Sequence, residues 1–266
     1  MREHSFTRVD EDAHPAAWVK CLDTLHAEPF YRDYKQRVVE LLSPLPAGLY
    51  LELGSGVGTD ALKLGARVIG VDRSATMCRE SRRRGLSRVV VADADALPFR
   101  SELVDGCWAD RTFQHLADPQ RALSELARVM KPDARIVVVD PDYGTQVMDC
   151  PDPELAGKVF DFRARHMLRN GTLASRMADL FSRGSLEDVS VERRTLTVRD
   201  PSSLDNVMGL RSWARTAAAH GALNQAEALR WEALYDALVD AERLRWAVDF
   251  VITSARKPPR SARRSG

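Results

Sequence analysis

A glycine-rich loop directly after a short apolar run is the strongest chemical signal in this 266-residue sequence. Residues 51–58 read Leu-Glu-Leu-Gly-Ser-Gly-Val-Gly, with Gly54, Gly56 and Gly58 at alternate positions. Glycine tolerates positive φ and, having no Cβ, lets a ligand approach the backbone. At the carboxyl end of a first parallel strand, such a loop lies where open α/β sheets bind ligands. We therefore expect a ligand here, with a turn that holds no ligand as the alternative; the spacing disfavours the GxGxxG of nicotinamide sites.

Carboxylates follow the next two apolar runs. Asp72 ends the run 68–71, and a carboxylate in this position can accept hydrogen bonds from the hydroxyls of a ribose. Asp72 could instead cap a helix that begins near Ala75, with Ser74 as a rival cap. Asp93 follows the third run and could accept a hydrogen bond from an exocyclic amine such as that of adenine. The alternative for Asp93 is an acidic turn in water.

The loop at 108–119, after the fourth run, supplies the candidate catalytic base. His115 in this loop has an ordinary pKa of about 6.5, which suits proton transfer near neutral pH. The alternative is a histidine packed under the loop and hydrogen-bonded to backbone. His166 is a second, more distant candidate for the same role.

To bring these residues together, the chain must form a parallel sheet with helices on both faces. Apolar runs alternate with amphipathic stretches between residues 49 and 139, which is typical of this α/β arrangement. The expected strands are 49–53, 67–71, 88–91, 103–109 and 136–139, and the expected helices between them are 60–64, 75–84 and 119–130.

The flanking segments are expected to be mainly helical. Residues 16–43 have helical periodicity that Pro29 interrupts, and residues 1–15 look loosely ordered. Further along, helices are expected over 152–181, 202–219 and 224–244, and strands over 189–198 and 246–254. We divide the chain into an N-terminal helical segment (1–47), a ligand-binding core (48–144), a helical cap (145–187), the C-terminal part of the sheet with its helices (188–256) and a disordered basic tail (257–266).

Composition limits the possible partners. The net charge is only +1, so no global field attracts nucleic acid or an anionic membrane. The basic tail lacks interleaved aromatic residues, which favours a solvated end over a nucleic-acid site. No apolar run approaches the roughly 20 residues that span a bilayer, and residues 1–12 do not resemble a signal peptide. The widely spaced cysteines predict no metal site and no disulfide framework; they are Cys21, Cys78, Cys107 and Cys150. We expect a cytoplasmic protein.

Four motifs in order resemble class I S-adenosylmethionine-dependent methyltransferases of the ubiquinone/menaquinone-biosynthesis type. Residues 51–58 look like motif I, and Asp72 looks like the acid that follows it. Residues 93–99, Asp-Ala-Asp-Ala-Leu-Pro-Phe, are similar to the DAxxLPF stretch of this branch. Residues 114–119 and 122–132 resemble its histidine loop and the helix that ends in Lys-Pro. The resemblance covers about residues 48–141 and departs from the usual pattern at Ser55, Val57 and the Asp133-Ala134 pair.

The resemblance implies a Rossmann-like, doubly wound seven-stranded sheet, mostly parallel with an antiparallel last strand. It also implies roles for single residues toward S-adenosylmethionine. Asp72 would bind the ribose, Asp93 with the Ala94 backbone would bind adenine, and Asp110 would lie near the methionine portion. The expected cofactor-binding residues are Glu52, Gly54, Ser55, Gly56, Gly58, Asp72, Arg73, Asp93, Ala94 and Asp110.

The expected activity is methyl transfer to an oxygen, nitrogen or carbon nucleophile of a specialised metabolite or quinone-like compound, leaving S-adenosylhomocysteine. In-line transfer needs alignment more than strong acid–base help. The alternatives are another reaction on the same fold, such as a cyclisation, or a cofactor-binding protein without catalysis. Substrate choice is expected from the N-terminal helices and from residues 145–185. Their basic cluster could meet an acidic substrate or simply face water; it consists of Arg163, Arg165, His166 and Arg169. A monomer or homodimer is expected.

Overall fold

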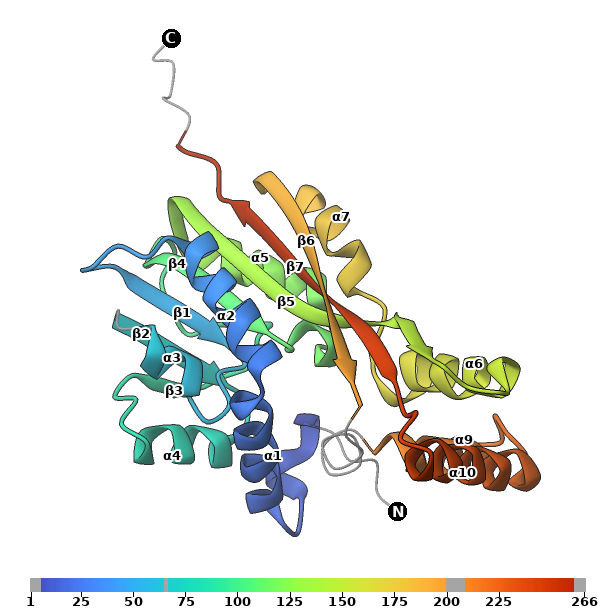
Figure 1. Ribbon diagram of the computed structural model, residues 1–266. Coiled ribbons are helices and arrows are strands. Elements are labelled where there is room, and N and C mark those ends of the chain that lie inside the picture. Colours follow the sequence, from blue (N-terminus) through green and yellow to red (C-terminus); the bar gives the residue numbers. More distant parts are fainter. Residues whose placement is uncertain (1–5, 65–66, 200–208, 261–266) are drawn as a thin grey trace.

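One seven-stranded sheet forms the centre of the computed structural model, which describes residues 6–64, 67–199 and 209–260 (Figure 1). The strand order is β3-β2-β1-β4-β5-β7-β6. The strands are β1 (Leu49–Leu53), β2 (Arg67–Asp72), β3 (Val89–Val91), β4 (Val104–Asp110), β5 (Met130–Met148), β6 (Glu187–Val198) and β7 (Trp246–Arg256).

The strand directions confirm the expected sheet. Strands β1 to β5 are parallel, whereas β7 runs antiparallel to both of its neighbours, β5 and β6. β1 lies between β2 and β4, with Leu51 opposite Ile69 on one side and Cys107 on the other. The strand order therefore reverses at β1, and this switch point is where open α/β sheets leave a crevice.

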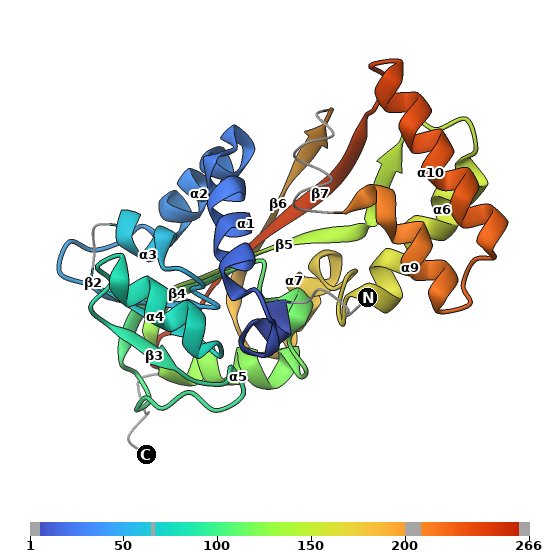
Figure 2. The same cartoon turned by 90° about the horizontal axis from the view of Figure 1, so that it is seen from below.

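Helices cover both faces of the sheet (Figure 2). They are α1 (Pro15–Ala27), α2 (Pro29–Leu42), α3 (Thr59–Lys63), α4 (Ala75–Arg83), α5 (Pro119–Val129), α6 (Pro153–Phe162), α7 (Met177–Arg183), α9 (Trp213–Ala219) and α10 (Gln225–Asp240). Alternate residues of β5 face two separate cores, since successive strand side chains point to opposite faces. Val137 and Val139 pack in the core that includes α2, whereas Ile136 and Val138 pack in the core that includes α5 and α7.

Helix α5 shows how local sequence sets these elements. Asp118 caps it by accepting a hydrogen bond of 2.9 Å from the Arg121 N–H, and Pro119 occupies the first helical position, where no N–H is needed. The apolar residues then recur every three or four positions and are all buried; they are Ala122, Leu123, Leu126 and Val129.

Strand β5 is much longer than the expected 136–139. It runs from Met130 to Met148, with a register shift against β7 between Asp142 and Val147. Pro132, Pro141 and Gly144 hid this strand in the sequence, because each resembles a strand end. The extension carries the sheet outward to α6, α9 and α10, which gather at one end of the molecule (Figures 1 and 2).

The expectation that residues 1–15 are loosely ordered is wrong for the described part. Residues Phe6–Glu11 form a 3₁₀ helix, η1, and Val9 is buried against Val57 and Met77. Residues 1–5 lie outside the described residues. Among the helices described, none is long and apolar enough to cross a membrane.

Two expectations near the C-terminus are met only in part. Of the helix expected over 202–219, the structure describes a 3₁₀ turn, Leu210–Ser212, and α9; residues 200–208 lie outside the described residues. The tail was expected to be disordered from residue 257. The Lys257 backbone instead pairs with Ala134 and Asp133, through hydrogen bonds of 2.9 and 3.0 Å. Residues 261–266 again lie outside the described residues.

Candidate active site

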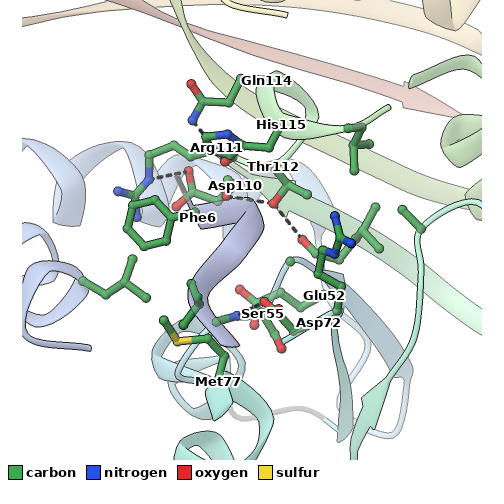
Figure 3. A pocket seen from close by; sticks show the side chains of 18 of the residues that line it. Phe6, Glu52, Ser55, Asp72, Met77, Asp110, Arg111, Thr112, Gln114 and His115 are labelled. Carbon is green, nitrogen blue, oxygen red and sulfur yellow. Dashed lines mark hydrogen bonds and ion pairs between the residues drawn. The ribbon is translucent and has the colours of Figure 1, made fainter. Parts of the chain in front are cut away.

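A cavity of about 400 Å³ lies at the carboxyl ends of β1 to β4, at the switch point of the sheet (Figure 3). Its size suits a small-molecule site. The loops after these strands form its floor, η1 and α1 border it, and Tyr143 of β5, Phe250 of β7 and residues from 163–169 complete the wall. Ten residues expected to act at the site line it: Glu52, Gly54, Ser55, Gly56, Asp72, Arg73, Asp93, Ala94, Asp110 and His115.

The glycine loop has the backbone conformation that its sequence predicts. Gly54, Gly56 and Gly58 all have positive φ, at 71°, 51° and 76°. A Cβ at Gly54 would overlap Thr112, and one at Gly58 would overlap Ser81. Gly58 precedes α3 and does not line the cavity, so its contribution is to the turn rather than to the cavity surface.

Asp72 fastens this loop to the end of β2. Its carboxylate accepts hydrogen bonds from the Gly56 N–H at 2.9 Å and the Ser74 N–H at 2.8 Å. Burial raises the pKa of Asp72. The cap of α4 is Ser74, whose hydroxyl accepts from the Met77 N–H at 3.1 Å. The capping role considered for Asp72 therefore belongs to Ser74, and the Asp72 carboxylate lies against the glycine loop.

Asp10, which the sequence analysis missed, holds η1 against the same corner. It accepts hydrogen bonds from the Ser74 hydroxyl at 2.7 Å and from the N–H groups of Ala75 and Thr76 at 2.8 and 3.0 Å. Burial opposes the charge of Asp10, but the hydrogen bonds from Thr76 and Ser74 outweigh it and lower its pKa to about 2. Phe6 and Val9 of η1 line the cavity, so this helix forms part of its wall (Figure 3).

Glu52 is a buried acid beneath the loop. It accepts hydrogen bonds from the Ala61 N–H and from Trp108 Nε1, both at 3.2 Å. Burial, reinforced by the nearby charge of Asp60, holds the pKa of Glu52 well above its usual range. A cation bound in the cavity would favour the ionised form of this carboxyl group and so lower its raised pKa.

Asp110, at the end of β4, gathers several donors around it. Its carboxylate accepts from the Tyr34 hydroxyl at 2.9 and 3.0 Å and forms ion pairs with Lys35 at 3.1 Å and Arg111 at 3.5 Å. Lys35 also pairs with Asp60. Asp110 is thus neutralised by protein cations, which leaves less of its charge for a ligand than the sequence suggests.

The far end of the cavity is aromatic and basic. The Arg111 guanidinium lies 4.9 Å from the centre of the Tyr31 ring, and Arg163 lies 5.0 Å from the ring of Tyr143. Burial, and then the charges of Arg163, Arg111 and Arg169, lower the pKa of His115 to about 4. At neutral pH the His115 imidazole is therefore uncharged, and it is a weaker base than an ordinary histidine.

The remaining candidates divide between the cavity and the surface. Asp93 and Arg73 are exposed at the rim, and the Ala94 side chain is buried. His166 is exposed, stacks on Phe162 at 5.3 Å and does not line the cavity. Tyr31, in the N-terminal helical region expected to contribute to substrate choice, lines the cavity. Sequence reasoning missed Arg111, although its position directly after Asp110 was an available signal.

Comparison with known sequences gives one family. Residues 51–138 match the family model described as a methyltransferase domain. The chain is 32% identical over 234 residues to an uncharacterised 37.1 kDa protein in transposon Tn4556 of Streptomyces fradiae, covering 84% of this chain and 68% of that protein. It is 37% identical over 117 residues to a demethylmenaquinone methyltransferase of Thermus thermophilus, covering 40% of this chain and 53% of that enzyme. The match thus spans about half the length of that relative.

Solved structures share the fold at low sequence identity. YcgJ of Bacillus subtilis superposes with a TM-score of 0.60 at 19% identity, over 85% of this chain and 99% of that one. Phosphoethanolamine N-methyltransferase 2 of Haemonchus contortus, in complex with S-adenosyl-L-methionine, gives 0.61 at 15%, over 96% and 60%. The [4+2]-cyclase SpnF gives 0.52 at 22%, over 85% and 80%. Together with the sequence matches, the sheet order and the glycine loop at its switch point show that this chain belongs to the class I S-adenosylmethionine-dependent methyltransferases.

Proposed function

We propose that this chain transfers the methyl group of S-adenosylmethionine to an oxygen, nitrogen or carbon nucleophile of a small molecule, leaving S-adenosylhomocysteine. The observation that carries the proposal is the Asp72–Gly56 hydrogen bond at the edge of the cavity. It places a carboxylate beside a side-chain-free turn, and this pair suits a ribose lying across the loop.

The residues present fit this cofactor. Gly54 and Gly56 line the cavity with backbone alone, where a Cβ at 54 would overlap Thr112. The same end of the cavity holds several carboxyl groups, which complement the positive sulfonium and amino groups of S-adenosylmethionine. Asp72 would bind the ribose hydroxyls, Asp93 and the Ala94 backbone the adenine, and Glu52 and Asp110 would lie near the methionine portion.

The bound cofactor supplies an activated methyl group, and the chain supplies alignment. The wall formed by Tyr31, Tyr143 and Phe250 would hold the acceptor and limit the access of water. His115 is the proposed acceptor of the proton that the nucleophile loses. Because the pKa of His115 is about 4, it is unprotonated at neutral pH, but its low basicity suits an acceptor that is itself fairly acidic.

A specialised metabolite or a quinone-like compound is the proposed substrate. The similarity to the demethylmenaquinone methyltransferase of Thermus thermophilus covers 40% of the chain, and the methyltransferase family model matches residues 51–138. The substrate wall also draws on Tyr143, Arg163 and Phe250, which lie beyond residues 51–138. We therefore do not transfer the quinone substrate from those relatives.

Calorimetric titration with S-adenosylhomocysteine, followed by an assay for its release from S-adenosylmethionine with metabolite acceptors, tests the proposal. We expect saturable binding at one site and acceptor-dependent release. No binding of either compound would refute the proposed cofactor. Substrate conversion without consumption of the methyl donor would favour a different reaction, such as cyclisation, and tight cofactor binding without turnover would favour a non-catalytic protein.

A further inference from the structure

Three arginines meet at the end of the cavity away from the glycine loop. Arg111 follows β4, whereas Arg163 and Arg169 come from the segment after α6, and all three line the cavity. Each lies near enough to His115 to lower the pKa of its imidazole. The three guanidinium groups therefore place positive charge at the same end of the cavity, although they come from distant parts of the sequence.

Arg163 differs from Arg111 in having no counterion among the described residues, and from Arg169 in being half-buried rather than exposed. Its guanidinium lies 5.0 Å from the centres of both the Tyr143 and the Trp213 rings. Its Nε is buried without a hydrogen-bond partner, and no ion pair joins it to a carboxylate of the described residues. Aromatic faces orient a guanidinium but do not neutralise it, and a buried charge is costly unless it is paired.

The neighbouring basic residues show the contrast. Arg165 lies in the same π-helical turn (Arg163–Met167), but it is 69% exposed and pairs with Asp161. Arg111 has Asp110 as its partner. The basic cluster seen in the sequence thus separates into two residues away from the cavity, Arg165 and His166, and two that line it, the half-buried Arg163 and the exposed Arg169.

We infer that the acceptor is an organic carboxylate, and that the Arg163 guanidinium, held between Tyr143 and Trp213, binds its carboxylate group. This inference rests on the proposed methyl transfer and adds the class of substrate. The planar fork of a guanidinium matches a carboxylate through two parallel hydrogen bonds. Arg169 adds positive charge, and Leu168 and Phe250 provide apolar surface for the body of the acid.

The charges of the cavity support this assignment. Its glycine-loop end is lined by the carboxyl groups of Glu52, Asp72 and Asp93, which suits a cationic cofactor. Its other end is lined by arginines, which suits an anionic acceptor. A positive sulfonium and a negative acceptor side by side also attract each other, which favours the alignment needed for transfer.

The test uses the full chain saturated with S-adenosylhomocysteine and the probes benzoate, 4-hydroxybenzoate, phenylacetate and the neutral 4-hydroxybenzamide. Calorimetry should show saturable binding of at least one acid and at least tenfold weaker binding of the amide, because a neutral amide loses the charged pair. Arg163→Gln should weaken the acid at least tenfold, whereas the matched control Arg165→Gln should leave it unchanged. Neither variant should alter the affinity for S-adenosylhomocysteine.

Several outcomes would overturn the inference. These are no saturable binding of any acid, equal binding of acid and amide, or no effect of Arg163→Gln. A loss of S-adenosylhomocysteine affinity in Arg163→Gln would assign this guanidinium to the cofactor carboxylate instead, and would also refute it. Failure of the unsubstituted chain to bind S-adenosylhomocysteine at all would refute the proposed function itself. Circular dichroism melting of both variants establishes that they are folded.

Discussion

The Gly56 N–H donates a hydrogen bond of 2.9 Å to Asp72 Oδ2, so the turn after β1 is tied to the end of β2. The other oxygen of Asp72 accepts from the Ser74 N–H, ahead of α4. One carboxylate thus fixes the positions of two loops that border the cavity. Its remaining lone pairs are available to the hydroxyls of a bound ribose.

Asp72→Asn should weaken the binding of S-adenosylhomocysteine about 10- to 100-fold, because hydrogen bonds to a charged group contribute about 1.5–3 kcal/mol. An asparagine also replaces one carboxylate oxygen with an NH₂ group, which cannot accept the hydrogen bond from the backbone N–H that faces it. Isothermal calorimetry measures the change. Asp133→Asn, at an exposed residue of β5 that does not line the cavity, is the matched control and should bind normally. Unchanged affinity in Asp72→Asn would contradict the proposed ribose contact.

Gly54→Ala should both destabilise the fold and impair cofactor binding. Its positive φ costs a non-glycine residue about 1–3 kcal/mol, and the added Cβ would also displace Thr112. Gly85 also has positive φ, at 105°, but a Cβ there meets no atom within 4 Å. Gly85→Ala should therefore lower the free energy of unfolding in urea without changing the affinity for S-adenosylhomocysteine. Equal affinities in the two variants would show that the Gly54 turn does not shape the site.

His115 should make stability depend on pH in the acid range. Its pKa is lowered from 6.5 to about 4, chiefly by burial, so below pH 6.5 the unfolded chain takes up a proton that the folded chain refuses. The stabilisation is complete above pH 6.5 and is lost as the pH falls toward 4, by up to about 3 kcal/mol. Urea unfolding between pH 7 and 4.5 should show a smaller fall in His115→Gln than in the unsubstituted chain. Parallel curves would place His115 in water rather than in the cavity wall.

Binding of S-adenosylmethionine should release protons. Burial raises the pKa values of Glu52 and Asp72, and the positive sulfonium favours their ionised forms. The affinity should therefore rise with pH, and more steeply for S-adenosylmethionine than for S-adenosylhomocysteine, which lacks the sulfonium charge. Calorimetry in buffers with different ionisation enthalpies counts the protons. Glu52→Gln should reduce the number released, and proton uptake on binding would show that the assumed sign is wrong.

The cofactor half of the fold was predictable because its signals are local. Glycine spacing, the acids that end strands and the amphipathic pattern of α5 each lie within about a dozen residues, and the structure assembles them as expected. Asp133, one of the positions where the sequence departs from the family pattern, adopts a φ of 65°, a backbone conformation that favours glycine. The sequence alone could not decide whether Asp72 or Ser74 caps α4, since the choice depends on the path of the loop.

The rest of the site depends on contacts between distant residues. Asp10 meets α4 across more than 60 residues, and Arg163 meets Trp213 across 50, so no local pattern predicts either contact. The length of β5 was missed because prolines and a glycine punctuate it. Arg163 and Arg165 look equivalent in the sequence, and only the π-helical turn sends one inward and the other to solvent.

The interior position of β7 has a consequence for synthesis on the ribosome. Of the described strands, β6 pairs with β7 alone, so it waits without a partner until residues 246–256 have been translated. Strands β1 to β4, whose loops include the glycine loop, can assemble long before this, whereas the part of the cavity wall that includes Phe250 cannot. A nascent chain with an open strand edge is prone to aggregate. The yield of folded protein should therefore rise with chaperone supply.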